Sequence, residues 1–113
     1  ATTSATMIDK VIRGSIGFQG LLMSDDVSMN ALEGSIAERS RAALSAGCDV
    51  ILHCNGKLEE MAEVAVEAPP LAGEALRRAE RAMAARRAPL PFDRAAGRSE
   101  LEDLLASLDG ANA

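Results

Sequence analysis

Three consecutive polar residues, Ser24, Asp25 and Asp26, follow a short apolar run and are the strongest candidates for chemistry in this sequence. The run Leu21-Leu22-Met23 is bounded by glycine, as is typical of a buried strand. The interior of a buried strand does not tolerate adjacent carboxylates, so we expect the strand to end at Met23. Asp25 would then lie at the carboxyl end of a parallel strand, where α/β proteins gather catalytic residues. A carboxylate there can act as a nucleophile, a base or a metal ligand, or it can simply stabilise a turn.

Three more side chains near predicted strand ends could contact a ligand. Asp26 could bind substrate or orient the loop, although a carboxylate bonded to local N–H groups is the simpler interpretation. Met29 could line a pocket as an adaptable apolar wall, or it could pack the loop onto the protein. His53 follows the run Val50-Ile51-Leu52 and by the same rule points toward the active end of the sheet. A strand-end histidine with a hydrogen-bonded ring is its simpler interpretation.

The two cysteines and the single histidine do not predict a metal site. Cys48, His53 and Cys54 are soft ligands, but alternation along a strand places residues 53 and 54 on opposite faces. We therefore expect no metal and no cofactor. Both thiols lie in apolar surroundings, so we expect them to be buried and reduced, which favours a cytoplasmic location.

The composition limits the classes of partner. A formal net charge of −5 argues against a nucleic-acid-binding protein, which normally presents a basic face. No apolar stretch approaches the roughly 18 residues of a membrane span, so we expect no membrane partner.

The elements that must position these residues alternate between helices and strands. Ser35-Ile36-Ala37-Glu38 is a capping box, and Gly47 is expected to end the helix that it opens. Two strands separated by that helix predict a parallel βαβ unit, and hence an α/β fold. The predicted helices are 5–13, 35–46, 58–68, 73–87 and a short one at 100–108, and the predicted strands are 21–23 and 50–52.

Arginines at 77, 78, 81, 86 and 87 give the predicted helix 73–87 a charged face. We expect this face to be solvated, with Glu74 and Arg78 spaced for an i,i+4 ion pair. The arginines could instead bind an acidic partner, and an alternative for the whole chain is a non-enzymatic helical interaction module that uses this helix and the tail.

Two segments resemble a known enzyme family. The segment Gly17-Phe18-Gln19-Gly20-Leu21-Leu22-Met23-Ser24-Asp25-Asp26-Val27-Ser28-Met29 closely resembles the nucleophile signature of bacterial beta-N-acetylhexosaminidases in glycoside hydrolase family 3. The stretch Ala46-Gly47-Cys48-Asp49-Val50-Ile51-Leu52-His53-Cys54 resembles the next strand of the same enzymes. The resemblance runs from about Thr3 to Ala85.

The resemblance implies a (β/α)8 barrel, of which this chain would supply about the last two βα units with extra C-terminal helices. Residues 1–88 would form the C-terminal part of the barrel domain, and residues 89–113 a proline-punctuated tail with a possible short helix. Strand edges and helix faces meant for the rest of a barrel would be open, so we expect the isolated chain to self-associate.

The resemblance also implies an activity. Asp25 would be the covalent nucleophile of a retaining glycosidase that removes terminal beta-N-acetylglucosamine from cell-wall muropeptides, a carbohydrate substrate. Asp26, Met29 and His53 are the candidates for substrate binding. The family's proton donor is a histidine in a loop motif that this sequence lacks, so His53 does not inherit that role, and we expect the isolated chain to be inactive. Beta-glucosidase-like members are the alternative, but they commonly carry an aromatic residue where this chain has Asp26.

Overall fold

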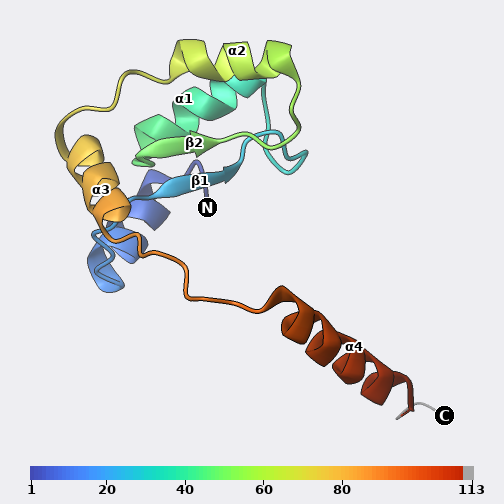
Figure 1. Cartoon of the computed structure of the whole chain (residues 1–113). Helices are drawn as coiled ribbons and strands as arrows, with labels where there is room; N and C mark the ends of the chain where they lie inside the picture. Colours follow the sequence, from blue (N-terminus) through green and yellow to red (C-terminus); the bar gives the residue numbers. More distant parts are fainter. Residues whose placement is uncertain (111–113) are drawn as a thin grey trace.

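The computed structural model describes residues 1–110 and alternates helices with two short strands. In chain order the elements are η1 (Met7–Ser15), β1 (Met23–Asp26), α1 (Ile36–Ala46), β2 (Val50–Leu52), α2 (Leu58–Glu67), α3 (Gly73–Ala84) and α4 (Arg94–Gly110). The strands β1 and β2 lie side by side (Figure 1) and pair in parallel, with Met23 opposite Val50 and Asp26 opposite Leu52. The predicted parallel pairing is confirmed, and the protein is an α/β protein.

The helix that connects the two strands begins and ends as its sequence predicts. The Ser35 hydroxyl accepts a hydrogen bond from the Glu38 amide, and the Glu38 carboxylate accepts one from the Ser35 amide. At the other end Gly47 adopts a φ of 113°, and its N–H donates to the carbonyls of Ala43 and Leu44. These contacts satisfy backbone groups that a helix end otherwise leaves without partners.

The core is small and lies on one face of the sheet. Ile8 of η1 packs with Ala43 and Ala46 of α1 and with Cys48, and Leu22 and Ile51 pack against this cluster. Alanine buries little apolar area, so Ala43 and Ala46 each contribute little to stability.

The opposite face of the sheet is open. Alternation along β1 turns Ser24 toward the core, where it is 5% exposed, and turns Met23 and Asp25 outward. Met23 is 51% exposed, and Asp25 is also exposed. Parallel sheets in proteins are normally covered on both faces. The Asp25 carboxylate therefore lies on a face of the sheet that residues 1–110 leave exposed.

The first strand differs from its predicted position. We expected it to end at Met23, but β1 runs from Met23 to Asp26 and includes all three polar residues. The prediction was wrong because each polar group has a place in the strand. The Ser24 hydroxyl accepts a hydrogen bond from the Leu52 amide, Asp26 has donors of its own, and Asp25 remains in solvent.

The helices also depart from prediction at their ends. In η1 the Ile16 amide donates to the Val11 carbonyl, five residues back, so this helix is wound more widely than the α-helix predicted for 5–13. The helix α3 ends at Ala84 rather than Arg87, a few residues before Pro89, which cannot continue a helix. Within the described residues, no helix is both long enough and apolar enough to cross a membrane.

Helix α4 stands apart from the rest of the chain in Figure 1 and is longer than predicted. It begins at Arg94 because the Asp93 carboxylate accepts hydrogen bonds from the amides of Ala95 and Ala96. The predicted tail 89–113 is described only to Gly110, and residues 111–113 lie outside the described residues.

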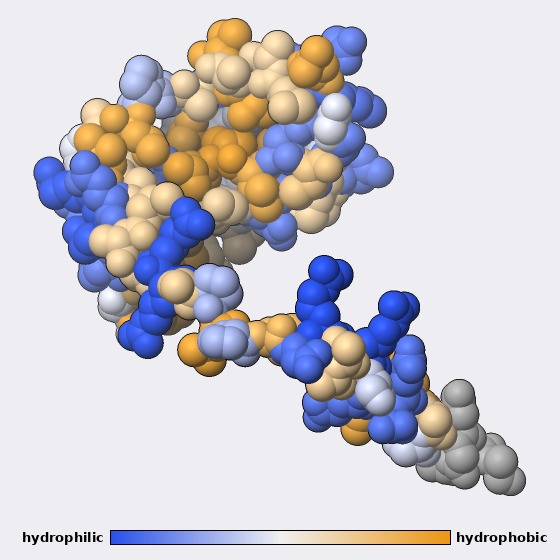
Figure 2. Space-filling view, in the orientation of Figure 1, coloured by the Kyte–Doolittle hydropathy of each residue, from blue (hydrophilic) through white to orange (hydrophobic). Residues whose placement is uncertain are grey.

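An apolar groove of about 570 Å³ lies between α2, the outer side of β2 and α3. Figure 2 shows it as a hollow with an orange, hydrophobic lining. This groove lies on the helix side of the sheet, away from the face that carries Asp25.

Candidate active site

Asp25 is the most exposed member of the polar triplet in β1. One of its carboxylate oxygens accepts a hydrogen bond from the Asp26 amide at 2.8 Å. The carboxylate otherwise projects from the open face of the sheet, near the carboxyl end of β1. It is therefore free to meet a ligand that approaches that face.

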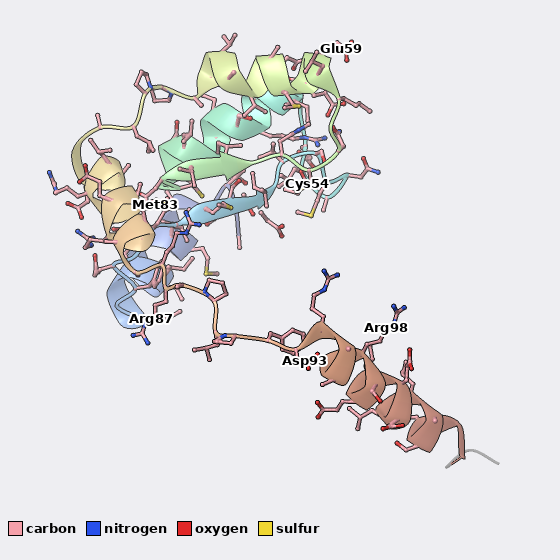
Figure 3. All side chains as sticks on the ribbon, in the orientation of Figure 1. Cys54, Glu59, Met83, Arg87, Asp93 and Arg98 are labelled. Carbon is pink, nitrogen blue, oxygen red and sulfur yellow. The ribbon has the colours of Figure 1, made fainter. Side chains whose placement is uncertain are left out.

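Both neighbours of Asp25 are bonded to the backbone of β2 or of the loop that follows it. The Leu52 amide donates to the Ser24 hydroxyl at 2.9 Å, and the Cys54 amide donates to Asp26 Oδ1 at 3.1 Å. Figure 3 shows Cys54 just beyond the ends of the two strands. The Ser24 hydroxyl thus binds across to β2.

Asp26 also organises the turn that follows β1. Ser28 donates to its carboxylate twice, through the amide at 3.0 Å and through the hydroxyl at 2.6 Å. The hydrogen bond from the Ser28 hydroxyl is the largest of the effects that lower the pKa of Asp26. Asp26 is thus the locally bonded carboxylate that was the simpler interpretation of its sequence position.

The loop that contains Met29 is fixed by an arginine that the sequence pattern did not single out. Arg39 of α1 donates from Nη1 to the carbonyl of Val27 at 3.1 Å and to that of Met29 at 3.0 Å. Val27 is fully buried, and Met29 is half-buried. Met29 therefore belongs to a loop whose backbone is held by two hydrogen bonds from Arg39.

His53 is turned toward α2. Its ring is 6% exposed, and Nε2 donates to Glu60 Oε2 at 3.0 Å. The same carboxylate accepts hydrogen bonds from Asn55 and Lys57. Hydrogen bonds from His53, then Asn55 and Lys57, lower the pKa of Glu60 to about 2. The predicted hydrogen-bonded ring is confirmed, and a role of His53 in substrate binding stays a prediction.

The most heavily bonded buried carboxylate, Asp49, was missed in the sequence. Its side chain is 6% exposed and bridges Arg13 and Arg78, each at 2.9 Å. The Leu22 amide donates to it at 2.8 Å. Burial raises the pKa of Asp49, but the hydrogen bonds from Leu22 and Arg78 and the charge of Arg13 outweigh burial and lower it. Asp49 thereby ties the start of β1 to the start of β2.

The same ion pairs correct the prediction for the arginine-rich helix. Arg78 is 16% exposed and binds Asp49, so the expectation of a solvated face is wrong at this position. It also lies 3.6 Å from Glu74, so the predicted i,i+4 pair is confirmed. Arg77 remains exposed and pairs with Glu74. Because one of its central arginines serves an internal contact, this helix is not a free basic surface.

The cysteines are both free, but only Cys48 is buried, so the prediction of a buried Cys54 is wrong. Cys54 is exposed because it follows the end of β2, in the segment that leads to α2. Burial raises the pKa of the Cys48 thiol, which disfavours the thiolate form. Within residues 1–110, no group of three or more His, Cys, Asp or Glu side chains is placed to hold a metal ion.

Residues 1–85 match the family model described as the Glycosyl hydrolase family 3 N terminal domain. A beta-hexosaminidase of Chromobacterium violaceum is 39% identical over 115 residues, which cover 97% of this chain and 29% of that protein. A beta-hexosaminidase of Vibrio cholerae is 47% identical over 66 residues, 57% of this chain and 20% of the relative. One from Tolumonas auensis is 46% identical over 52 residues, 44% of this chain and 16% of the relative. The chain thus spans less than a third of the length of each of these relatives.

Proposed function

Because the chain belongs to glycosyl hydrolase family 3, we propose that it forms the nucleophile-bearing part of a retaining glycosidase that removes terminal beta-N-acetylglucosamine. The observation that carries the proposal is the position of Asp25. Its carboxylate lies near the carboxyl end of a parallel strand, on the face of the sheet that the described residues leave open. The relatives named beta-hexosaminidase support the choice of sugar.

In the proposed reaction the Asp25 carboxylate attacks the anomeric carbon from the face opposite the leaving group. A bond forms between that carbon and an aspartate oxygen while the bond to the leaving oxygen breaks, and the leaving oxygen takes a proton from a general acid. Water then attacks the same carbon, releases Asp25 and gives a proton to the group that acted as the acid. We place this acid/base group in the part of the relatives that this chain does not span.

We further propose that β1 and β2 are two of the eight strands of a (β/α)8 barrel. In such a barrel the strands enclose a packed interior and the helices form an outer ring. The open face with Met23 and Asp25 would then face the interior, and η1, α1 and α2 would belong to the ring. Residues 1–88 would form this barrel portion, and residues 89–113 a separate tail, which agrees with the position of α4 in Figure 1.

We make two proposals about the isolated chain. Without a proton donor it would be inactive, and with a bare sheet face it would self-associate. For the whole enzyme we propose muropeptides as the substrate class, met during cell-wall recycling in the cytoplasm. The free thiols Cys48 and Cys54 support a reducing compartment.

The test is to trap the glycosyl–enzyme intermediate in a chimera. This chain replaces the aligned portion of the Chromobacterium violaceum relative, which covers 97% of it. The chimera is treated with a 5-fluoro N-acetylglucosaminyl fluoride and digested with trypsin. We expect the label on Asp25, within the peptide that follows Arg13 and ends at Arg39.

The matched controls are two aspartate-to-asparagine variants. Asp25→Asn should abolish the label, whereas Asp93→Asn, which alters only the cap of α4, should retain it. A label on any residue other than Asp25 would refute the proposed nucleophile.

A further inference from the structure

The two residues that flank Asp25 hold it from both sides. Ser24 accepts from the Leu52 amide, and Asp26 accepts from the Cys54 amide, so each neighbour of Asp25 spans the gap between the strands. Asp25 itself has no such link, since the one hydrogen bond described for its carboxylate comes from the adjacent Asp26 amide. Its orientation is therefore set by the backbone between two anchored positions.

These two links replace regular strand pairing at this point. The ladder between β1 and β2 is irregular between Met23 and Asp26, and the Leu52 carbonyl accepts from Val27. The Leu52 and Cys54 amides, which donate to the Ser24 and Asp26 side chains, thus hold the two segments together where the backbone ladder is disturbed. Irregular pairing of this kind is often used to aim a side chain next to an active site.

The segment after Asp25 is anchored as well. Val27 is fully buried, and its carbonyl accepts from Arg39. Ser28 binds the Asp26 carboxylate through two hydrogen bonds, which leaves that carboxylate with three donors in all. Because the Asp26 carboxylate already accepts three hydrogen bonds from the protein, it has little acceptor capacity left for a sugar hydroxyl.

We propose that Ser24 and Asp26 form a cross-strand clamp that positions Asp25, and that Asp26 is a positioning residue rather than a substrate ligand. The proposal rests on the proposed function of Asp25 as the nucleophile. A short carboxylate side chain has few torsions with which to correct a misplaced backbone, and a displacement of about 1 Å can lower the rate of the chemical step about 100-fold. The clamp fixes the backbone on both sides of that carboxylate.

The kinetic test uses the same chimera with Ser24→Ala, Asp26→Ala and Asp26→Asn. We expect Ser24→Ala and Asp26→Ala to lower kcat by about 10- to 100-fold while KM changes by less than about twofold. Asp26→Asn keeps one carbonyl oxygen for the Cys54 amide, so it should restore part of the lost kcat. The control Asp93→Asn, another aspartate that accepts from backbone amides, should leave both constants unchanged. A raised KM with unchanged kcat in the Asp26 variants would make Asp26 a substrate ligand and overturn the proposal.

A structural test on the 113-residue chain separates the clamp from the catalytic role. Amide hydrogen exchange should accelerate at Cys54 in Asp26→Ala and at Leu52 in Ser24→Ala, by about tenfold or more. The Val50 amide donates to the Leu22 carbonyl, a bond that involves neither of the replaced side chains, so exchange of the Val50 amide should stay unchanged. Unaltered exchange at Cys54 and Leu52 would disprove the clamp. Altered exchange together with a sugar label outside Asp25 would retain the clamp and refute the proposed function instead.

Discussion

Arg78 of α3 donates a hydrogen bond to Asp49 Oδ1 at 2.9 Å, although the two residues lie 29 positions apart in the sequence. Arg13 reaches the other oxygen of the same carboxylate from η1, 36 positions away in the other direction. The Leu22 amide binds that oxygen too, just before β1. One buried carboxylate therefore joins the first helix, the sheet and α3, which together support the strand that carries Asp25.

Replacing this carboxylate should weaken the fold substantially. Asp49→Asn leaves the largely buried Arg13 without a counter-charge and Arg78 with only the more distant Glu74, which should lower the free energy of unfolding by about 3 kcal/mol. Urea denaturation followed by circular dichroism measures the loss. The control is Glu67→Gln, which removes the carboxylate partner of the exposed Arg41 and should cost much less. Equal losses in the two variants would contradict a central role for Asp49.

Acid should weaken the turn after β2. The pKa of Glu60 falls from its ordinary value of 4.5 to about 2, so its stabilising effect is complete above pH 4.5 and is lost as the pH falls through about 2. The lowered pKa of Asp49 acts in the same direction below 3.8. Urea unfolding measured between about pH 5 and about pH 2 should therefore show falling stability. In Glu60→Gln the free energy of unfolding should fall less steeply with decreasing pH. An unchanged slope would show that Glu60 is not a source of the acid sensitivity.

The glycine that ends α1 should not tolerate a side chain. Gly47 has a φ of 113°, and a Cβ there would lie 3.0 Å from Cγ2 of the core residue Ile8. Gly47→Ala should therefore lower the free energy of unfolding by about 2 kcal/mol. Gly17→Ala is the matched control, since Gly17 also has a positive φ, of 72°, but a Cβ would meet nothing within 4 Å. A smaller loss at Gly47 than at Gly17 would contradict the role of the Ile8 contact.

The isolated chain should not hydrolyse a chromogenic N-acetylglucosaminide. It carries the proposed nucleophile but no histidine loop of the kind that the family resemblance assigns as the proton donor. Initial rates with and without protein measure the activity. Turnover above background that disappears in Asp25→Asn would show that this chain holds a complete active site.

Local sequence patterns predicted the parts of the fold that depend on neighbouring residues. The capping box from Ser35 to Glu38 and the stop at Gly47 follow from contacts within a few positions, so their types and spacing were sufficient. The short apolar run Val50–Leu52 likewise predicted β2 correctly. The position of Asp25 near a strand end followed from the strand pattern, although the strand itself extends further.

The contacts across long stretches of sequence could not be predicted in this way. Asp49 directly precedes an apolar strand, so its carboxylate can be expected to be buried and to need partners. Nothing in the neighbouring sequence identifies Arg13 or Arg78 as those partners. The extension of β1 through Ser24 and Asp26 depends on donors from Leu52 and Cys54, which belong to another part of the chain. Burial of a polar residue becomes acceptable only once such a partner is in place.

The links from Ser24 and Asp26 to β2 also have a consequence for biosynthesis. A chain is made from its N-terminus, so Asp25 is added before residues 52 and 54, whose amides anchor its two neighbours. Until they emerge, the carboxylate has its neighbours in sequence but not the strand that orients it. The strand contacts that orient Asp25 therefore form only after the later residues have emerged, so the proposed nucleophile would be positioned late in synthesis.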